Sequence, residues 1–248
     1  MSGCANNPAR AKQGRPKQTM RTVATLVLFS LLLAPAAGTA QTRGWTEDRV
    51  VEQLNKSAEN FQTVTANLQF TKVTAVVDDK SVETGRLYFT KKGRILLEFL
   101  NPEPKEVLFS GNKAQIYFPK MSQIQEFDLG KHRAMVEQYL LLGFGTKGDD
   151  LRDSYLIAIM GESRMDGRSV LQLELTPKDQ RLRNQIHKIH LWIDLSSWLP
   201  VQQKFFEVGG DYFETRYSEM KVNATIAAGK QRLSAPRGTK VVKPRPSM

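Results

Sequence analysis

Cysteine is almost absent from this sequence of 248 residues, whose one example, Cys4, precedes the first apolar run. A single cysteine cannot form an internal disulfide, although exported proteins are free to contain them. A lipid-modified precursor would carry a cysteine directly after its apolar leader, and Gln41 stands at that position here. The expected mature chain therefore has neither a disulfide nor a lipid anchor, and at about 200 residues it can bury a sufficient core without them.

Near the N-terminus the apolar run is too short to span a membrane. It covers residues 22–33, whereas a transmembrane helix needs roughly 20 residues. Basic residues precede the run, and the small residues Gly38 and Ala40 stand at the −3 and −1 positions of a cleavage site after Ala40. This order is typical of a secretory signal peptide rather than a membrane anchor. We therefore predict export to the periplasm with removal of residues 1–40, and the start codon is Met1 or Met20.

Acidic residues are missing from both ends of the chain, so the formal net charge of +11 is misleading. Removal of residues 1–40 takes away five cations and leaves 31 basic against 25 acidic residues. The segment 229–248 holds six of these cations and no acid, so residues 41–228 are balanced. A nucleic-acid-binding module would carry its charge on the folded surface. We therefore expect no nucleic-acid partner, and we expect a solvated basic tail with at most a weak attraction to anionic lipid headgroups.

Groups that carry catalysis or bind metals are sparse. Of the three histidines, His187 and His190 lie three positions apart on a predicted strand, so they point to opposite faces and cannot chelate one metal together. No serine lies in a Gly-x-Ser-x-Gly turn, and no glycine-rich loop has the strand-to-helix context of a phosphate site. We therefore predict no metal, no cofactor and no enzymatic activity. The weakest alternative is an envelope lipid hydrolase whose triad assembles only in space.

The abundant feature is alternation of apolar and polar residues, which is typical of half-buried strands. A helix is predicted over residues 46–61, with Thr46 as its N-cap, and a strand over 64–71 follows it. Further strands are predicted over residues 82–90, 94–100, 106–110, 113–118, 123–128, 155–160, 169–176, 186–194, 201–208 and 212–219. A helix over 132–142 and a helical turn at 149–153 interrupt this series. The pattern predicts one domain over residues 41–228, and then a segment 229–248 with a last short strand near 231–234.

Residues 81–118 read as consecutive antiparallel strands that carry many apolar and aromatic side chains and no reaction centre. An ordinary core would explain such a sheet, and a surface that holds an apolar ligand would explain it as well. The helix predicted over 132–142 favours the second interpretation, because its apolar face includes Met135 and flexible leucines and glycines flank it. We interpret this helix as a movable lid.

The order of these elements resembles the LolA family of periplasmic outer-membrane lipoprotein carriers. The resemblance covers residues 45–241 and rests on several segments. These are Gly85-Arg-Leu-Tyr-Phe89, Arg94-Ile-Leu-Leu-Glu-Phe99, Pro102 with Pro104, Ser110–Tyr117, Leu191-Trp-Ile-Asp194 with Leu199-Pro200, Tyr217–Val222 and Leu233–Val241. Two positions depart from the family pattern, because Gly93 replaces a proline and Asn112 replaces an aspartate. These departures leave open a divergent branch or a carrier of another lipid.

The resemblance implies an α+β fold of mostly antiparallel strands, namely an incomplete, half-open β-barrel of about 11 strands with helices covering its open mouth. It implies an apolar cavity for acyl chains, with Arg94 as a latch that holds the lid closed through hydrogen bonds to the lid backbone. The side chains expected to line this cavity are Leu68, Phe70, Leu87, Phe89, Leu97, Phe99, Ile116, Phe118, Met135, Tyr139, Leu142, Trp192 and Phe206.

The function implied is that of a soluble, monomeric carrier that moves lipoproteins from the inner to the outer membrane. Its partners would be lipoprotein acyl chains or another lipid, an inner-membrane lipoprotein-releasing complex and an outer-membrane acceptor. Physical chemistry supports the need for such a carrier, because each buried methylene is worth roughly 0.8 kcal/mol. The alternative function is an envelope-stress sensing module on the same fold, which binds lipoprotein and a regulatory protein.

Overall fold

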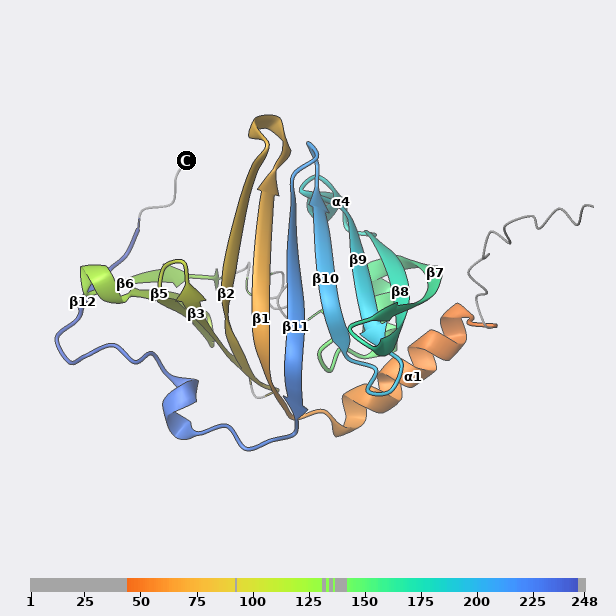
Figure 1. Ribbon diagram of the computed structural model, residues 1–248, viewed down its shortest axis with the longest axis horizontal. Helices are drawn as coiled ribbons and strands as arrows, with labels where there is room; N and C mark the ends of the chain where they lie inside the picture. Colours follow the sequence, from red (N-terminus) through yellow and green to blue (C-terminus); the bar gives the residue numbers. More distant parts are fainter. Residues whose placement is uncertain (1–43, 92, 131–132, 134–135, 137–141, 245–248) are drawn as a thin grey trace, which may run out of the picture. The chain divides into compact units, whose positions relative to one another are not determined.

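The computed structural model describes residues 44–91, 93–130, 133, 136 and 142–244, all within one compact unit of residues 39–248. Its centre is one twelve-stranded sheet in the order β12-β6-β5-β4-β3-β2-β1-β11-β10-β9-β8-β7 (Figure 1). The strands are β1 (Thr63–Thr74), β2 (Asp79–Thr90), β3 (Arg94–Asn101), β4 (Lys105–Ser110), β5 (Lys113–Phe118), β6 (Gln123–Asp128), β7 (Tyr155–Met165), β8 (Arg168–Pro177), β9 (Ile186–Asp194), β10 (Pro200–Glu207), β11 (Tyr212–Val222) and β12 (Lys240–Val242).

Neighbouring strands pair antiparallel, and β12 alone among them pairs parallel, with β6. The long-range pairing of β1 with β11 joins the two halves of the sheet, with Phe70 opposite Thr215. Over the described residues the sheet does not close, because β7 and β12 remain its two edges. The predicted mostly antiparallel, half-open architecture is therefore confirmed, with twelve strands in place of about eleven.

Helix α1 (Glu47–Asn60) begins where the sequence predicts it. The side chain of Thr46 accepts a hydrogen bond from the Arg49 backbone N–H at 3.3 Å, and acidic residues occupy the first turn. Its buried face includes Val50 and Leu54, which join a core made with the inward side chains of β8 and β9. The short helices α3 (Gly148–Ser154) and α4 (Gln180–Arg183) add Leu151 and Leu182 to the same core. Within the described segments, no helix is long and apolar enough to cross a membrane.

Gly85 allows β2 and β3 to approach closely, and the register of the two strands shifts beside it. A β-carbon at this position would lie 2.1 Å from the carbonyl oxygen of Glu98 and 2.9 Å from the α-carbon of Phe99. These atoms belong to the backbone of β3, so the strand itself would have to move. A glycine at an irregularity in a strand commonly marks such a close backbone approach.

We expect Gly85→Ala to destabilise the protein by about 1–3 kcal/mol, as overpacking of a well-packed site does. The measurement is the midpoint of chemical unfolding, compared with that of Gly229→Ala. A β-carbon at Gly229 would meet nothing within 4 Å, so this control is expected to unfold like the wild type. Equal midpoints for both variants and the wild type would contradict the packing role of Gly85.

The chain after β11 runs along the outer side of the sheet and returns to its edge, as the blue segment in Figure 1 shows. The 3-10 helix η4 (Ala228–Gln231) places Lys230 Nζ 2.8 Å from Glu98 Oε1, and this hydrogen bond raises the pKa of Lys230. Glu106 on β4 accepts hydrogen bonds from the backbone N–H and the hydroxyl of Ser234. We call residues 223–244 the C-terminal strap.

One sequence prediction about this segment is wrong, because the last short strand lies at Lys240–Val242 and not near residues 231–234. Most residues of 229–244 are exposed, as expected of a solvated tail. The segment is nevertheless attached to the outer face of the sheet through Glu98 and Glu106, which the sequence did not predict. Counting its cations could not reveal those contacts, because the acidic partners lie more than 100 residues earlier in the chain.

Candidate functional site

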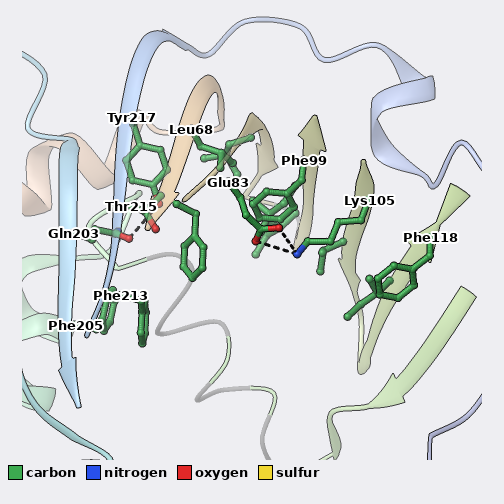
Figure 2. Close-up of a pocket in the computed structure, with 16 residues that line it drawn as sticks. Leu68, Glu83, Phe99, Lys105, Phe118, Gln203, Phe205, Phe213, Thr215 and Tyr217 are labelled. Atoms are coloured by element: carbon green, nitrogen blue, oxygen red, sulfur yellow. Dashed lines mark hydrogen bonds and ion pairs between the residues drawn. The ribbon is translucent and has the colours of Figure 1, made fainter. Parts of the chain in front are cut away.

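A cavity of about 330 Å³ lies on the inward face of the sheet, bordered by β1–β5 and by β10 and β11. Such a volume falls in the range of small-molecule sites, roughly 300–1,000 Å³. Seven strands contribute its wall (Figure 2). The lining residues are Leu68, Phe70, Glu83, Leu87, Ile95, Leu97, Phe99, Lys105, Val107, Ile116, Phe118, Gln203, Phe205, Phe213, Thr215 and Tyr217.

Strand alternation explains why these residues share one wall. Side chains on one face of a strand recur every second residue, and on β3 the lining residues are Ile95, Leu97 and Phe99. Cross-strand pairing continues the wall sideways, because Leu97 stands opposite Leu87 on β2 and Val107 on β4. The sheet register therefore gathers the apolar residues of distant segments into one surface.

Aromatic rings make up much of the wall. Phe205 and Phe213 face each other across β10 and β11 as a stacked pair, with ring centroids 4.7 Å apart. The ring centroid of Phe70 lies 6.1 Å from that of Phe213 and 6.5 Å from that of Phe99. Phe70 thereby links the two halves of the sheet. Phe61, which follows α1, packs with Phe144 in a core cluster that also contains Leu68 and Phe99 of the cavity wall. The cavity that these rings border is largely apolar and remains unfilled by the described side chains.

Two pairs of polar side chains interrupt the apolar wall, in addition to Thr215. On β2 and β4, Glu83 and Lys105 form an ion pair whose Nζ–Oε1 distance is 2.7 Å. On β10 and β11, the Tyr217 hydroxyl donates to Gln203 Oε1 at 3.1 Å, and Gln203 Nε2 donates to the backbone oxygen of Leu142. Burial raises the pKa of Tyr217 far above its usual value, so the phenol stays protonated and acts as a hydrogen-bond donor.

The structure places seven of the predicted lining residues on the cavity wall, namely Leu68, Phe70, Leu87, Leu97, Phe99, Ile116 and Phe118. Phe89 has the same strand parity, but it is buried beneath Phe61 with ring centroids 5.5 Å apart. Leu142 is also buried, in the core beside α1 rather than on the wall. Met135 and Tyr139 lie outside the described residues.

The prediction that Trp192 and Phe206 line this cavity is wrong, because both lie on the opposite face of the sheet. Phe205 points into the cavity, so its neighbour Phe206 must point away. The His190 ring confirms this arrangement, because its centroid lies 5.7 Å from Trp192 and 4.8 Å from Phe206. Both aromatic runs contain adjacent apolar residues, so the sequence alone does not fix which of them faces inward.

The sequence prediction missed the contribution of β10 and β11, in particular Gln203, Phe205, Phe213, Thr215 and Tyr217. Three of these recur at every second position along β11, which is the signal that could have identified them. Glu83 and Lys105 were also missed, because charged residues in strands usually face water. Only the pairing of β2, β3 and β4 reveals that they point inward together.

Arg94 begins β3 with an exposed side chain, and no hydrogen bond of that side chain is found within the described part of the chain. Of the predicted lid over 132–142, only residues 133, 136 and 142 are described, so its movement and its contact with Arg94 remain predictions. No cluster of three or more metal-ligating side chains occurs in the described ranges. His190 instead lies 2.8 Å from Glu174, whose pKa is lowered by hydrogen bonds from Lys188 and His190.

Comparison with known proteins gives one family and a set of similar folds. The model of the MucB/RseB N-terminal domain matches residues 54–235. Among curated proteins, no sequence matches this chain significantly. An uncharacterized conserved protein from Thermus thermophilus is 14% identical, with a TM-score of 0.52, over 79% of this chain and 98% of its own.

Two further solved structures carry informative names. MucB in the Pseudomonas aeruginosa MucA/MucB complex is 16% identical with a TM-score of 0.47, and the match covers 76% of this chain and 61% of that one. A LolA superfamily protein from Nitrosomonas europaea is 14% identical with a TM-score of 0.38, over 76% of this chain and 98% of its own. The chain thus matches less than two thirds of the length of MucB. The LolA-type resemblance predicted from the sequence motifs is confirmed at the level of the family and its fold.

Proposed function

Because the chain belongs to the MucB/RseB N-terminal domain family, we propose that it binds the acyl chain of a lipoprotein or a related lipid in the sheet cavity. One observation carries this proposal, namely a cavity that the described side chains leave unfilled and whose largely apolar wall comes from seven strands. An ordinary core fills such space with its own side chains, because protein interiors are packed as densely as organic crystals. Here the inward residues of β1–β5, β10 and β11 instead border a cavity that no described side chain fills.

Transfer of an acyl chain from water into this cavity is strongly favourable. At roughly 0.8 kcal/mol for each buried methylene, a long chain gains on the order of 10 kcal/mol when it leaves water. The same quantity is the barrier that keeps a free lipid in its membrane. A protein that offers an apolar wall lowers that barrier, and it does so by binding alone, without making or breaking a covalent bond.

The finer form of the proposal is a monomeric periplasmic carrier, exported with loss of residues 1–40, that moves lipoproteins from the inner to the outer membrane. It would receive its cargo from an inner-membrane lipoprotein-releasing complex and deliver it to an outer-membrane acceptor. Delivery requires that another state compete with the bound chain. The predicted lid over 132–142 and its latch Arg94 would supply that competition.

A second candidate function follows from the family match. MucB has been solved in complex with MucA. By analogy, a chain of the same domain family would bind a regulatory protein in addition to the lipid proposed above. In that case the cavity would sense stray lipoprotein, and occupancy would change the affinity for the partner. The two candidates share the cavity and differ in what happens after the chain is bound.

Native mass spectrometry of protein isolated from the periplasm tests the shared part of the proposal. We expect a mass addition that corresponds to an acylated lipid or lipoprotein. Activation of the complex in the gas phase should remove this ligand and leave the free protein. Protein that carries no lipid, even after incubation with membrane extract, would contradict acyl-chain binding. Transfer of a fluorescent acylated peptide between vesicles would then favour the carrier, whereas bound protein that never delivers its cargo would favour the sensor.

A further inference from the structure

Glu83 and Lys105 form an ion pair on the cavity wall. A purely apolar ligand would make no use of these two charges. Lys105 Nζ lies 2.7 Å from Glu83 Oε1 and 3.0 Å from Oε2. The pair bridges β2 and β4 across β3. Figure 2 shows both side chains on the cavity side of their strands, beside the ring of Phe99.

Water reaches this pair only in part. The side chains of Lys105 and Glu83 are 26% and 20% exposed, and Lys105 Nζ also lies 4.8 Å from the centroid of the Phe99 ring. Withdrawing two charges from water is costly, and apolar residues of similar volume often replace a buried ion pair without loss of stability. The stability of the wall therefore does not account for these two residues. Hydrogen bonds to a polar group of the ligand would account for them.

The hydrogen-bonding groups of the pair are only partly used. An ammonium has three donors, and a carboxylate has about four acceptor positions. Two donors of Lys105 point to Glu83, so the pair keeps one donor and further acceptor positions on its cavity side. A group that both accepts and donates, such as an amide or a hydroxyl, fits these adjacent positions. A carboxylate or phosphate would gain from Lys105 but would be repelled by Glu83, because like charges at close range disfavour each other.

We propose that Glu83 and Lys105 form a headgroup subsite that selects acyl ligands with a neutral, hydrogen-bonding head, such as an amide or a hydroxyl, over acyl ligands with an anionic head. This inference rests on the proposed function, because it assumes that the adjoining apolar wall holds the chain. It adds the chemical class of the ligand. Phe70 and Phe99, whose ring centroids lie 6.5 Å apart, share the cavity wall with the subsite, and the acyl chain would pack against this apolar part of the wall.

Displacement of the neutral fluorescent probe N-phenyl-1-naphthylamine from the full chain measures this selectivity. The competing ligands are monolauroylglycerol and laurate, which carry the same acyl chain, at pH 7.5 and below their aggregation concentrations. We expect the wild type to bind monolauroylglycerol about tenfold more tightly than laurate, the effect of one well-formed hydrogen bond to a charged group. Equal affinities would overturn the subsite and leave acyl-chain binding intact, whereas binding of neither ligand would overturn acyl-chain binding and the subsite with it.

Variants test the roles of the two residues separately. Glu83→Gln keeps a hydrogen bond to Lys105 but removes the repulsion, so laurate is expected to bind at least as tightly as monolauroylglycerol. Lys105→Met removes the donor, and we expect about tenfold weaker binding of monolauroylglycerol. The matched control is Glu126→Gln, because Glu126 pairs with Lys113 at 2.9 Å outside the cavity and its loss changes the net charge equally. An unchanged selectivity in Glu83→Gln, or the same change in Glu126→Gln, would overturn the proposal.

Discussion

Leu97→Glu is expected to abolish co-purification of lipid while the protein stays folded. Leu97 lies at the middle of the cavity wall, opposite Leu87 and Val107 on the two neighbouring strands. It is only half-buried, so a glutamate there can reach water through the empty cavity. A bound acyl chain would close off that water, and the resulting desolvation of the carboxylate is costly. We expect lipid occupancy, measured by native mass spectrometry, to fall by about tenfold or more.

The matched control for this variant lies on the same strand. Leu100 is 40% exposed on β3 and does not line the cavity, so Leu100→Glu adds the same charge without touching the site. We expect Leu100→Glu to retain the lipid content of the wild type. Circular dichroism and thermal unfolding establish that both variants fold. Lipid retained by a folded Leu97→Glu variant would show that the acyl chain does not occupy this cavity.

Glu106→Ala is expected to release the C-terminal strap from the sheet. Glu106 is buried on the outer face of β4, and its two oxygens accept hydrogen bonds from the hydroxyl and the backbone N–H of Ser234. Hydrogen bonds to a charged group contribute about 1.5–3 kcal/mol each. Loss of both acceptor oxygens therefore removes the attachment of Ser234 to β4. We expect amide hydrogens of residues 228–242 to exchange much faster, and the thermal unfolding midpoint to fall.

Glu103→Ala provides the comparison for this effect. Glu103 pairs with Lys120 at 3.2 Å, but both side chains are largely exposed, and such surface ion pairs contribute about 0–1 kcal/mol. We expect its hydrogen exchange and its unfolding midpoint to match those of the wild type. If the strap exchanges equally slowly in the wild type and in Glu106→Ala, then other contacts hold it, such as the ion pair of Lys230 with Glu98.

Local patterns predicted the strands well because most of them alternate regularly between apolar and polar residues and end near turn residues, although β1 and β2 extend to 12 residues each. The predicted strand at 113–118 coincides with β5, and the predicted helix over 46–61 differs from α1 by one residue at each end. The direction of a side chain is harder to predict where both faces of a strand are apolar. Phe205 and Phe206 are equally apolar in the sequence, and only the pairing of Phe205 with Phe213 assigns one to the cavity and the other to the outer face.

Long-range contacts account for the rest of what the sequence could not predict. The inward position of Lys105 depends on its partner Glu83, which lies 22 residues earlier and two strands away. The attachment of the strap depends on Glu106, which lies 128 residues before Ser234. Neither contact leaves a periodic signal in the segment where it occurs. Sequence reasoning therefore recovered the elements and half of the cavity wall, and it missed the polar positions that give the cavity its chemical selectivity.

The parallel pairing of β12 with β6 has a consequence for the order in which the sheet is completed. Val241 pairs with Ile124, so this edge of β6 stays unpaired until residues 240–242 have joined the sheet. An unpaired strand edge is a template for association with other chains, and contacts between distant segments form slowly. A folding intermediate that lacks β12 is therefore more vulnerable to aggregation through β6 than the folded protein is, and a chaperone that shields β6 in that intermediate would raise the yield of folded molecules.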